Sequence, residues 1–195
     1  MIYELYENHI KKDLTVFPEE LCLMITGKEL AEDRDKLLDV LKWVQEFPEI
    51  KRFIIHISAK SAEEVNLPVE EMAKTARIRV SSPDNEYTAG SGTPEVLAVL
   101  GKCGRREISD AVAKIAESGI NAEDITEETI EKHLLYQVTP DFVIKTGGNH
   151  LTDFLIWQSV YSELFFADVN WNRFRRVDFL RALRDYQSRQ RRFGK

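Results

Sequence analysis

Short, continuous apolar runs alternate with segments of helical periodicity along most of this chain. The apolar runs have the length of a buried strand and are bounded mainly by proline, glycine or charged residues. They cover residues 21–25, 53–57, 96–100 and 142–144. Residues 33–47, between the first two runs, carry leucine, valine and phenylalanine at helical spacing. Strands that are apolar throughout and separated by helices are typical of a mostly parallel sheet covered by helices on both faces. The predicted fold class is therefore α/β, with a central sheet flanked by helices.

Weaker patterns predict the remaining segments. Residues 69–76 are expected to form a short helix, residues 76–80 an edge-like strand, and the Ser-, Pro- and Gly-rich residues 81–94 a loop. Further helices are predicted at residues 109–118, after the N-cap Thr126, over the apolar residues 155–166, and over the amphipathic residues 177–192.

Composition narrows the class of protein. The 195 residues suit one domain spanning 1–195, and the net charge of −6 argues against a nucleic-acid-binding domain. Cys22 and Cys103 match no metal or redox spacing, as expected of a reduced, intracellular protein. No apolar run approaches the roughly 18 residues of a membrane span, and the amino-terminal residues lack the apolar core of a secretory signal. We therefore expect a cytoplasmic protein.

The carboxyl-terminal segment reverses this acidic balance. Nine basic residues follow residue 172, against Asp178 and Asp185. Such a block forms either a solvated helix face or a surface for a phosphate-bearing ligand or an acidic partner.

Two of the predicted strands end in glycine-bearing turns. These are Thr26-Gly27-Lys28 and the segment 145–150, and in open parallel sheets ligands bind beyond the carboxyl ends of the strands. Gly147 and Gly148 would let the backbone approach a ligand, and their amides would cradle phosphate oxygens beside Lys145. A tight strand-to-helix turn would use the same residues. Known phosphate loops, dinucleotide fingerprints, zinc pairs and serine elbows are absent from the sequence.

Residues near the second turn leave two interpretations open. His150 is either an ordinary loop residue or a metal ligand. Glu163 lies in an apolar stretch, where a carboxylate is costly to bury unless it is paired or bound to a metal. The surrounding aromatic residues belong either to the core or to a subunit interface. The interface candidates are Trp157, Tyr161, Phe165, Phe166 and Trp171.

The last third of the chain carries an ordered series of motifs. The run DFVIKTGGNHLTDFLIWQ begins at Asp141, a Ser-Glu-Leu-Phe-Phe stretch covers residues 162–166, and Arg-Phe-Gly covers residues 192–194. This series resembles the cis-prenyltransferases, the family of undecaprenyl and dehydrodolichyl diphosphate synthases. Weaker similarities to the family cover residues 2–11, 104–108 and 125–138. The resemblance implies a dimer-forming cis-prenyltransferase fold.

The resemblance also implies roles for particular residues. Family members bind isopentenyl and allylic diphosphates with the help of Mg²⁺. The terminal Arg192 and the amide of Gly194 would act in trans, reaching across the dimer to bind diphosphate in the neighbouring active site. The residues matching the substrate-binding positions are Lys145, Thr146, Gly147, Gly148, Thr152 and Arg105, and those retained near the metal are His150 and Glu163.

Departures from the family pattern concern catalysis. In active members an aspartate after the first strand holds Mg²⁺ on the allylic diphosphate, and Thr26 stands at that position here. A hydroxyl is a poor substitute for a carboxylate as a Mg²⁺ ligand, so its loss is expected to slow the reaction by many orders of magnitude. Lys145 replaces one diphosphate-binding arginine, and a second is missing after His150. Too few residues lie between residues 61 and 77 for the full helix that lines the product tunnel.

Three hypotheses follow from these departures. The first is a non-catalytic or weakly catalytic subunit of a heteromeric cis-prenyltransferase, of archaeal type and similar in kind to the Nogo-B receptor. Its partner would be an aspartate-bearing homologue that holds most of the Mg²⁺. The second is a self-sufficient homodimeric cis-prenyltransferase with an altered metal site. The third is a regulatory protein that binds prenyl diphosphates without catalysis. The lipid-like substrates leave peripheral contact with a membrane open.

Overall fold

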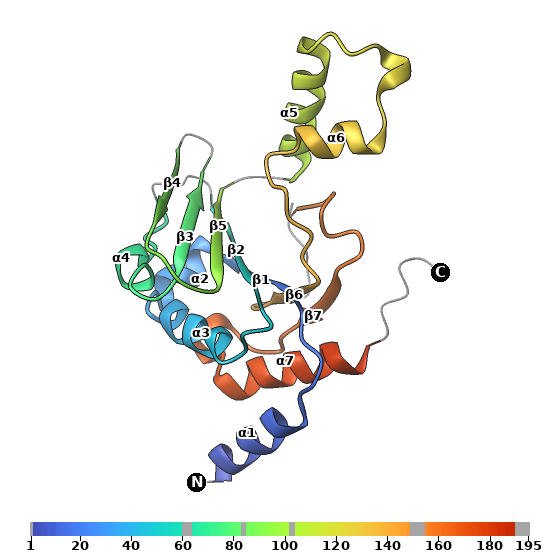
Figure 1. Cartoon of the computed structure of the whole chain (residues 1–195). Helices are drawn as coiled ribbons and strands as arrows, with labels where there is room; N and C mark the ends of the chain where they lie inside the picture. Colours follow the sequence, from blue (N-terminus) through green and yellow to red (C-terminus); the bar gives the residue numbers. More distant parts are fainter. Residues whose placement is uncertain (1, 60–63, 83–84, 102–103, 149–154, 190–195) are drawn as a thin grey trace.

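The fold is built around one twisted, mostly parallel sheet (Figure 1). A computed structural model of the chain describes residues 2–59, 64–82, 85–101, 104–148 and 155–189. Within these residues the strand order is β4-β3-β5-β2-β1-β6-β7, and only β4 runs antiparallel to its neighbour. The strands are β1 (Glu20–Thr26), β2 (Arg52–Ser58), β3 (Arg77–Ser81), β4 (Glu86–Ala89), β5 (Glu95–Leu100), β6 (Phe142–Lys145) and β7 (Glu163–Phe166). The prediction of a mostly parallel α/β sheet is confirmed, but helices cover one face of it in the described residues, and segments without helix cover the other.

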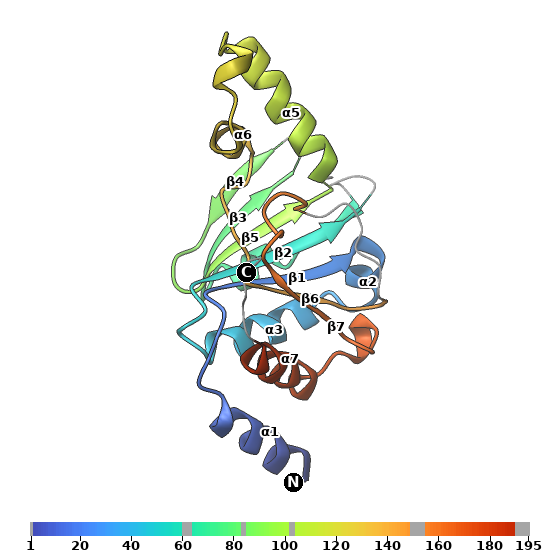
Figure 2. The ribbon, with the colours of Figure 1, turned by 90° about the vertical axis from the view of Figure 1, so that its right-hand side faces the viewer.

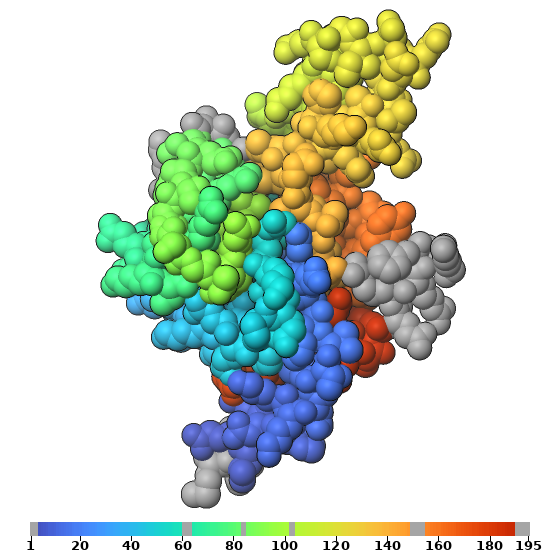
Figure 3. Space-filling view, viewed as in Figure 1, coloured from blue at the N-terminus to red at the C-terminus, as the bar shows by residue number. Residues whose placement is uncertain are grey.

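Helices lie against one face of this sheet and form an arm beyond it. The elements are α1 (Ile2–Asp13), α2 (Gly27–Glu32), α3 (Lys36–Gln45), α4 (Val69–Met72), α5 (Gly104–Glu117), α6 (Glu127–His133) and α7 (Arg176–Ser188), with short 3-10 turns at Ala122–Asp124 and Trp171–Arg173. Helices α5 and α6 project from the body of the molecule (Figure 2), and the space-filling view shows them as a separate lobe (Figure 3).

Successive side chains of a strand point to opposite faces of the sheet, so the hydrophobic core is divided into two clusters, one on each face. Leu21, Leu23 and Ile25 of β1 point toward α3 and α7 and belong to the larger hydrophobic cluster. Cys22 and Met24, on the opposite face, belong to a smaller cluster that the segment 134–138 covers. Burial of the Cys22 thiol raises its pKa well above the ordinary value, as expected of a structural cysteine.

Two segments differ from the sequence prediction. The expected loop over residues 81–94 contains β4, which pairs with β3, so β3 is not an edge strand. The expected helix over residues 155–166 is instead a turn at 156–161 followed by β7. The β7 backbone extends the sheet, with Glu163 N donating to Asp141 O at 2.9 Å and Ala167 N donating to Lys145 O at 2.8 Å. Periodicity does not separate helix from strand in so short an apolar run.

The family resemblance predicts a shortened helix in the segment between β2 and β3, and its role in lining a product tunnel stays a prediction. Helix α4 has only 4 residues and lies in the segment between β2 and β3. None of the described helices has the length and apolar character needed to cross a membrane.

An ion-pair cluster joins α7 to α1 and α3. Arg176 donates to both carboxylate oxygens of Glu46, at 3.0 and 2.7 Å, and to Glu7 at 2.8 Å, while Lys11 donates to Glu46 at 2.6 Å. Hydrogen bonding from Arg176, and secondarily from Lys11, lowers the pKa of Glu46.

We expect this ion-pair cluster to make the free energy of unfolding depend on pH. Because the folded-state pKa of Glu46 is lowered, its contribution is present above the ordinary carboxyl value and is lost as pH falls through the lowered pKa. The Glu46→Gln variant should lose about 1 kcal/mol of unfolding free energy at pH 7 and less at pH 3. Urea unfolding at both pH values measures this difference. An equal loss at pH 3 and pH 7 would contradict the prediction.

Candidate functional site

The two glycine-bearing turns predicted from the sequence lie side by side. Strands β1 and β6 are parallel neighbours, with Met24 opposite Lys145, so Thr26 and Thr146 leave the sheet together at its carboxyl edge. Thr146 is fully buried, and its Oγ1 donates to Glu29 Oε1 at 3.4 Å. The structure therefore places these turns where a ligand of an open α/β sheet is expected.

Glu29 occupies the space between the two turns. Its Oε2 accepts hydrogen bonds from Thr26 N and Thr26 Oγ1, both at 2.8 Å, and Thr26 Oγ1 in turn accepts from Glu29 N at 3.1 Å. The pair is a capping box at the start of α2. Thr26 thus serves the helix cap and holds a carboxylate in the turn. We missed Glu29 at the sequence level, although the Thr-x-x-Glu spacing signals it.

The backbone at Gly147 lies close to the Glu29 carboxylate. Its φ is +69°, and a methyl group added there would lie 2.0 Å from Glu29 Oε1. The Gly147 amide donates to Val169 O at 3.3 Å, so backbone already uses one of the two amides that we expected to cradle phosphate. Gly148 has a φ of +125° with open space around its Cβ position.

A double-mutant cycle tests this packing. Gly147→Ala should lose about 1 kcal/mol from its left-handed backbone, and roughly 1 kcal/mol more because the methyl group displaces the Glu29 cap. In a Glu29→Ala background only the backbone cost should remain. Gly148→Ala, which has no such neighbour, should lose the same free energy in both backgrounds. Urea unfolding of the six proteins gives the comparison, and equal Gly147→Ala losses in both backgrounds would contradict it.

The other predicted substrate-binding residues are dispersed or not described. Lys145 is buried at the end of β6, and its ammonium group donates to the carbonyl of Thr146. Arg105 lies exposed in the first turn of α5, on the arm. The predictions for His150, Thr152, Arg192 and Gly194 lie outside the described residues.

The structure separates Glu163 from the two turns. Glu163 begins β7 opposite Phe142, at the amino end of β6, whereas Lys145 at the carboxyl end lies opposite Phe166. The Glu163 carboxylate accepts from Arg189 Nη1 at 3.1 Å instead of lying in an apolar helix. In the described part of the chain, Glu163 belongs to no group of three acidic, histidine or cysteine side chains that could hold a metal. Its predicted metal role stays a prediction, because His150 lies outside the described residues.

Trp171, which we predicted at a subunit interface, is a core residue. Its side chain is fully buried, stacks on Phe174 with ring centroids 6.4 Å apart, and donates from Nε1 to Asp33 O at 2.8 Å. The interface prediction is wrong here because the 3-10 turn directs the indole ring into the larger cluster under the sheet.

Of the remaining interface candidates, three are partly buried and one is exposed to solvent. Phe165 packs on Phe142, with ring centroids 6.3 Å apart, and Phe166 is also partly buried. Trp157 is partly buried and donates from Nε1 to Glu131 of α6 at 3.3 Å. Tyr161 is 62% exposed and lies in one turn with two further exposed apolar residues. The exposed apolar surface of this region comprises Ile156, Val160 and Tyr161, and we call it the 156–161 surface.

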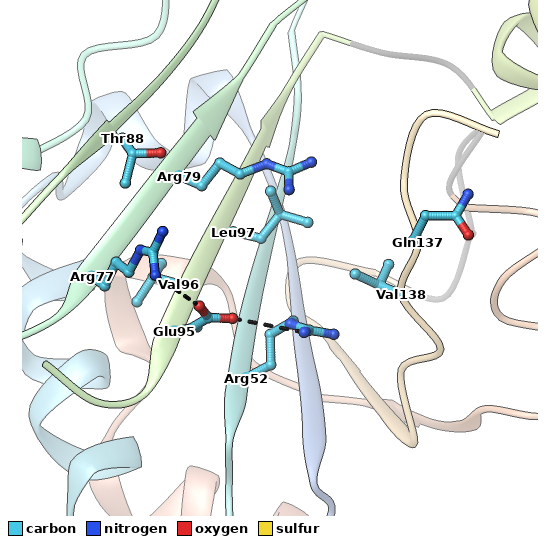
Figure 4. A pocket seen from close by; sticks show the side chains of 9 residues that line it. All are labelled: Arg52, Arg77, Arg79, Thr88, Glu95, Val96, Leu97, Gln137 and Val138. Atoms are coloured by element: carbon cyan, nitrogen blue, oxygen red, sulfur yellow. Dashed lines mark ion pairs between the residues drawn. The ribbon is translucent and has the colours of Figure 1, made fainter. Parts of the chain in front are cut away.

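An arginine-lined cavity of about 180 Å³ lies at the opposite, amino edge of the sheet (Figure 4). Glu95 stands in register between Arg77 and Arg52 and approaches each at 3.7 Å, and Arg79 pairs with Glu86 at 3.0 Å. Arg52 also pairs with Glu20. Three carboxylates thus balance the three guanidinium charges, and the cross-strand pairs stabilise the sheet. The cavity therefore offers a diphosphate no concentration of unbalanced positive charge.

Comparison with known proteins identifies the family. The family model for prenyltransferases of the undecaprenyl diphosphate synthase type matches residues 37–194. The chain belongs to the cis-prenyltransferase family, as the sequence motifs indicated.

Individual relatives span both long- and short-chain synthases by name. The tritrans,polycis-undecaprenyl-diphosphate synthase (geranylgeranyl-diphosphate specific) of Methanocaldococcus jannaschii is 41% identical over 177 residues, covering 84% of this chain and 61% of that protein. The short-chain Z-isoprenyl diphosphate synthase of Mycobacterium bovis is 37% identical over 189 residues, covering 88% of this chain and 68% of that protein. Lavandulyl diphosphate synthase from Lavandula x intermedia shares the fold, with a TM-score of 0.67 at 18% identity over 92% of this chain and 99% of that chain.

The described residues at the two turns do not fit the Mg²⁺ ion that the family implies. Mg²⁺ takes octahedral oxygen ligands that include carboxylates. The carboxylate here, Glu29, already accepts from Thr26 and Thr146. In the described ranges no three acidic, histidine or cysteine side chains are grouped to hold a metal. We therefore assign no chemical step to a metal bound by these residues.

Proposed function

We propose that this chain is a non-catalytic or weakly catalytic subunit of a heteromeric cis-prenyltransferase. The partner would be an aspartate-bearing homologue that binds the allylic diphosphate with Mg²⁺. This chain would supply Arg192 and the Gly194 amide to hold isopentenyl diphosphate in that partner's active site. The assembly would extend an allylic diphosphate into a polyprenyl diphosphate in the cytoplasm.

The observation that carries this proposal is the Thr26–Glu29 capping box. A diphosphate entering between the two turns would meet the Glu29 carboxylate, which Thr26 and Thr146 hold in place. Two negatively charged groups in one partly buried turn repel each other strongly. The substitution that removes the metal-binding aspartate thus also closes this chain's own turn to the substrate.

The proposed role of the terminal Arg-Phe-Gly segment in the partner's active site does not require the two turns of this chain to bind a ligand. A guanidinium group and a backbone amide bind diphosphate oxygens by charge-assisted hydrogen bonds, and neither needs a metal carried by this chain. The partner would bind on the 156–161 surface, where apolar side chains are exposed beside the edge strand β7.

A self-sufficient homodimer is the second candidate. The observation in its favour is that relatives 36–41% identical to this chain carry the names of synthases. In such an enzyme, Glu29 would move away from Thr26 to admit the substrate.

One assay distinguishes the candidates. Radiolabelled isopentenyl diphosphate, an allylic primer and Mg²⁺ are incubated with this chain alone, with the aspartate-bearing homologue from the same organism alone, and with the two mixed. We expect long polyprenyl products only, or at least tenfold more, in the mixture. Equal activity from this chain alone would establish the homodimer. Binding of prenyl diphosphate without any stimulation would instead assign the chain to regulation.

A further inference from the structure

Helix α7 and the residues just before it carry positive charge that the rest of the chain lacks. Residues 173–189 have a net charge of +4, whereas residues 1–172 have a net charge of −13. Asp178 in this segment is only 10% exposed, and it approaches Arg175 at 3.3 Å and Arg181 at 3.5 Å. The solvent-facing basic side chains of the segment are those of Arg173, Arg175, Arg181, Arg184 and Arg189. The outer surface of α7 is therefore rich in arginine.

Helix α1 lies against α7, at the end of the molecule opposite the arm (Figures 1 and 2). The Arg181 guanidinium lies over the Tyr6 ring of α1, 5.4 Å from the ring centroid. Hydrogen bonding to Arg181, and secondarily to Arg184, lowers the pKa of Tyr6. Arg181 and Arg184 therefore share one surface with α1.

Two exposed apolar side chains accompany these arginines. Leu5, next to Tyr6 in α1, is 67% exposed, and Val16, which follows α1, is 51% exposed. Val16 N donates to Gln187 Oε1 at 3.0 Å, so Val16 lies beside the last turn of α7. The α1–α7 face is defined here by Leu5, Val16, Arg181 and Arg184.

We infer that the α1–α7 face binds the surface of an anionic phospholipid bilayer. Guanidinium groups pair well with lipid phosphates, and exposed apolar side chains enter the bilayer interface beside them. A fluid bilayer accepts apolar side chains one at a time. A protein partner would instead need a packed apolar core, which the separate side chains of Leu5 and Val16 do not offer.

The acidic remainder of the chain does not prevent this contact. At physiological ionic strength, exposed charges more than about 8 Å from the bilayer are largely screened, so the face that touches the lipid decides the sign of the interaction. Each arginine close to an anionic bilayer strengthens binding by about fivefold. The inference rests on the proposed function in one respect, since an assembly that makes polyprenyl diphosphate has a lipid product for such a bilayer to receive.

Co-sedimentation of the full chain with vesicles tests this inference. Vesicles of phosphatidylserine and phosphatidylcholine should bind the chain at least about tenfold more tightly than vesicles of phosphatidylcholine alone, and high salt should remove the preference. Replacing both Arg181 and Arg184 by glutamine should weaken binding about twentyfold, whereas replacing both by lysine should preserve it. Leu5→Ser should weaken binding about threefold at either salt concentration.

The matched control removes the same charge from another part of the surface. Arg77 and Arg79 of β3 are 60% and 46% exposed, and replacing both by glutamine should leave vesicle binding within about twofold of the wild type. An equal loss in this control would overturn the inference, because it would show that binding follows net charge alone. Melting temperatures of all variants are compared, and Arg184→Gln with Leu5→Ser replaces the glutamine pair if that pair is unstable.

The remaining outcomes are equally decisive. Equal binding to anionic and neutral vesicles would overturn the inference, as would unchanged binding of the glutamine pair, which would place the contact elsewhere on the chain. If the glutamine pair bound vesicles normally but lost affinity for the aspartate-bearing homologue, the face would belong to an acidic protein partner. The vesicle assay needs neither partner nor catalysis, so its failure leaves the proposed function intact. A mixed complex without polyprenyl synthesis would refute the proposed function and leave the vesicle result standing.

Discussion

In the mixed complex, Arg192→Ala is expected to lower kcat/KM for isopentenyl diphosphate at least thirtyfold. Truncating one member of a hydrogen-bonded charge pair costs about 2–5 kcal/mol, and each 1.4 kcal/mol corresponds to a factor of ten. The loss should be concentrated in isopentenyl diphosphate, because the allylic primer would bind to the partner's own residues. Initial rates with either substrate varied separately measure the two effects.

The adjacent arginine provides the control for this experiment. Arg191→Ala removes the same charge from the same segment but does not match the family's terminal motif. It should retain activity within about twofold. A fully active Arg192→Ala complex would refute the tail's role in trans. Equal losses in both variants would show that the segment acts only through its total positive charge.

Trp171→Ala should lower the unfolding free energy by about 3–5 kcal/mol, the largest stability change that we predict. The indole ring is fully buried among aromatic side chains, and truncation would leave a cavity and an unsatisfied carbonyl at Asp33. Equilibrium urea unfolding of the purified chain measures this loss. Trp171→Phe should lose less, since it keeps most of the apolar volume and gives up mainly the hydrogen bond.

Tyr161→Ala is the matched aromatic control. Tyr161 is 62% exposed, so its removal should change the unfolding free energy by less than about 0.5 kcal/mol. The same variant should weaken assembly with the partner, measured as the dissociation constant of the mixed complex. If Trp171→Ala folded with nearly wild-type stability and lost only assembly, Trp171 would belong to the interface after all.

The strands were predictable because burial on both faces leaves a simple sequence signal. The apolar runs at 21–25, 53–57 and 96–100 all lie within observed strands, and the register keeps them side by side. The segment 155–166 was not predictable by the same rule. Its turn and strand are set by pairing with β6, a long-range contact that leaves no local periodicity.

The sequence predicted where the candidate site lies in the sheet, but it did not predict the side-chain contacts within the site. Thr26 and Lys145 identified the two turns, because topology brings the carboxyl ends of adjacent strands together. Glu29 escaped notice because a capping box is an ordinary device of helix starts, and only the structure shows that it contacts Thr146 and Gly147. Glu163 was misplaced for a related reason, since its ion partner lies 26 residues away in the sequence.

The Thr26–Glu29 capping box also has an evolutionary consequence. Placing an aspartate at residue 26 by a single substitution would remove the hydroxyl donor and set two carboxylates against each other in the same turn. Glu29 would have to change before or together with residue 26. If this chain is a non-catalytic subunit, as we propose, a return to metal-dependent catalysis would pass through a less stable intermediate. The division of labour between two subunits that we propose would then be difficult to reverse.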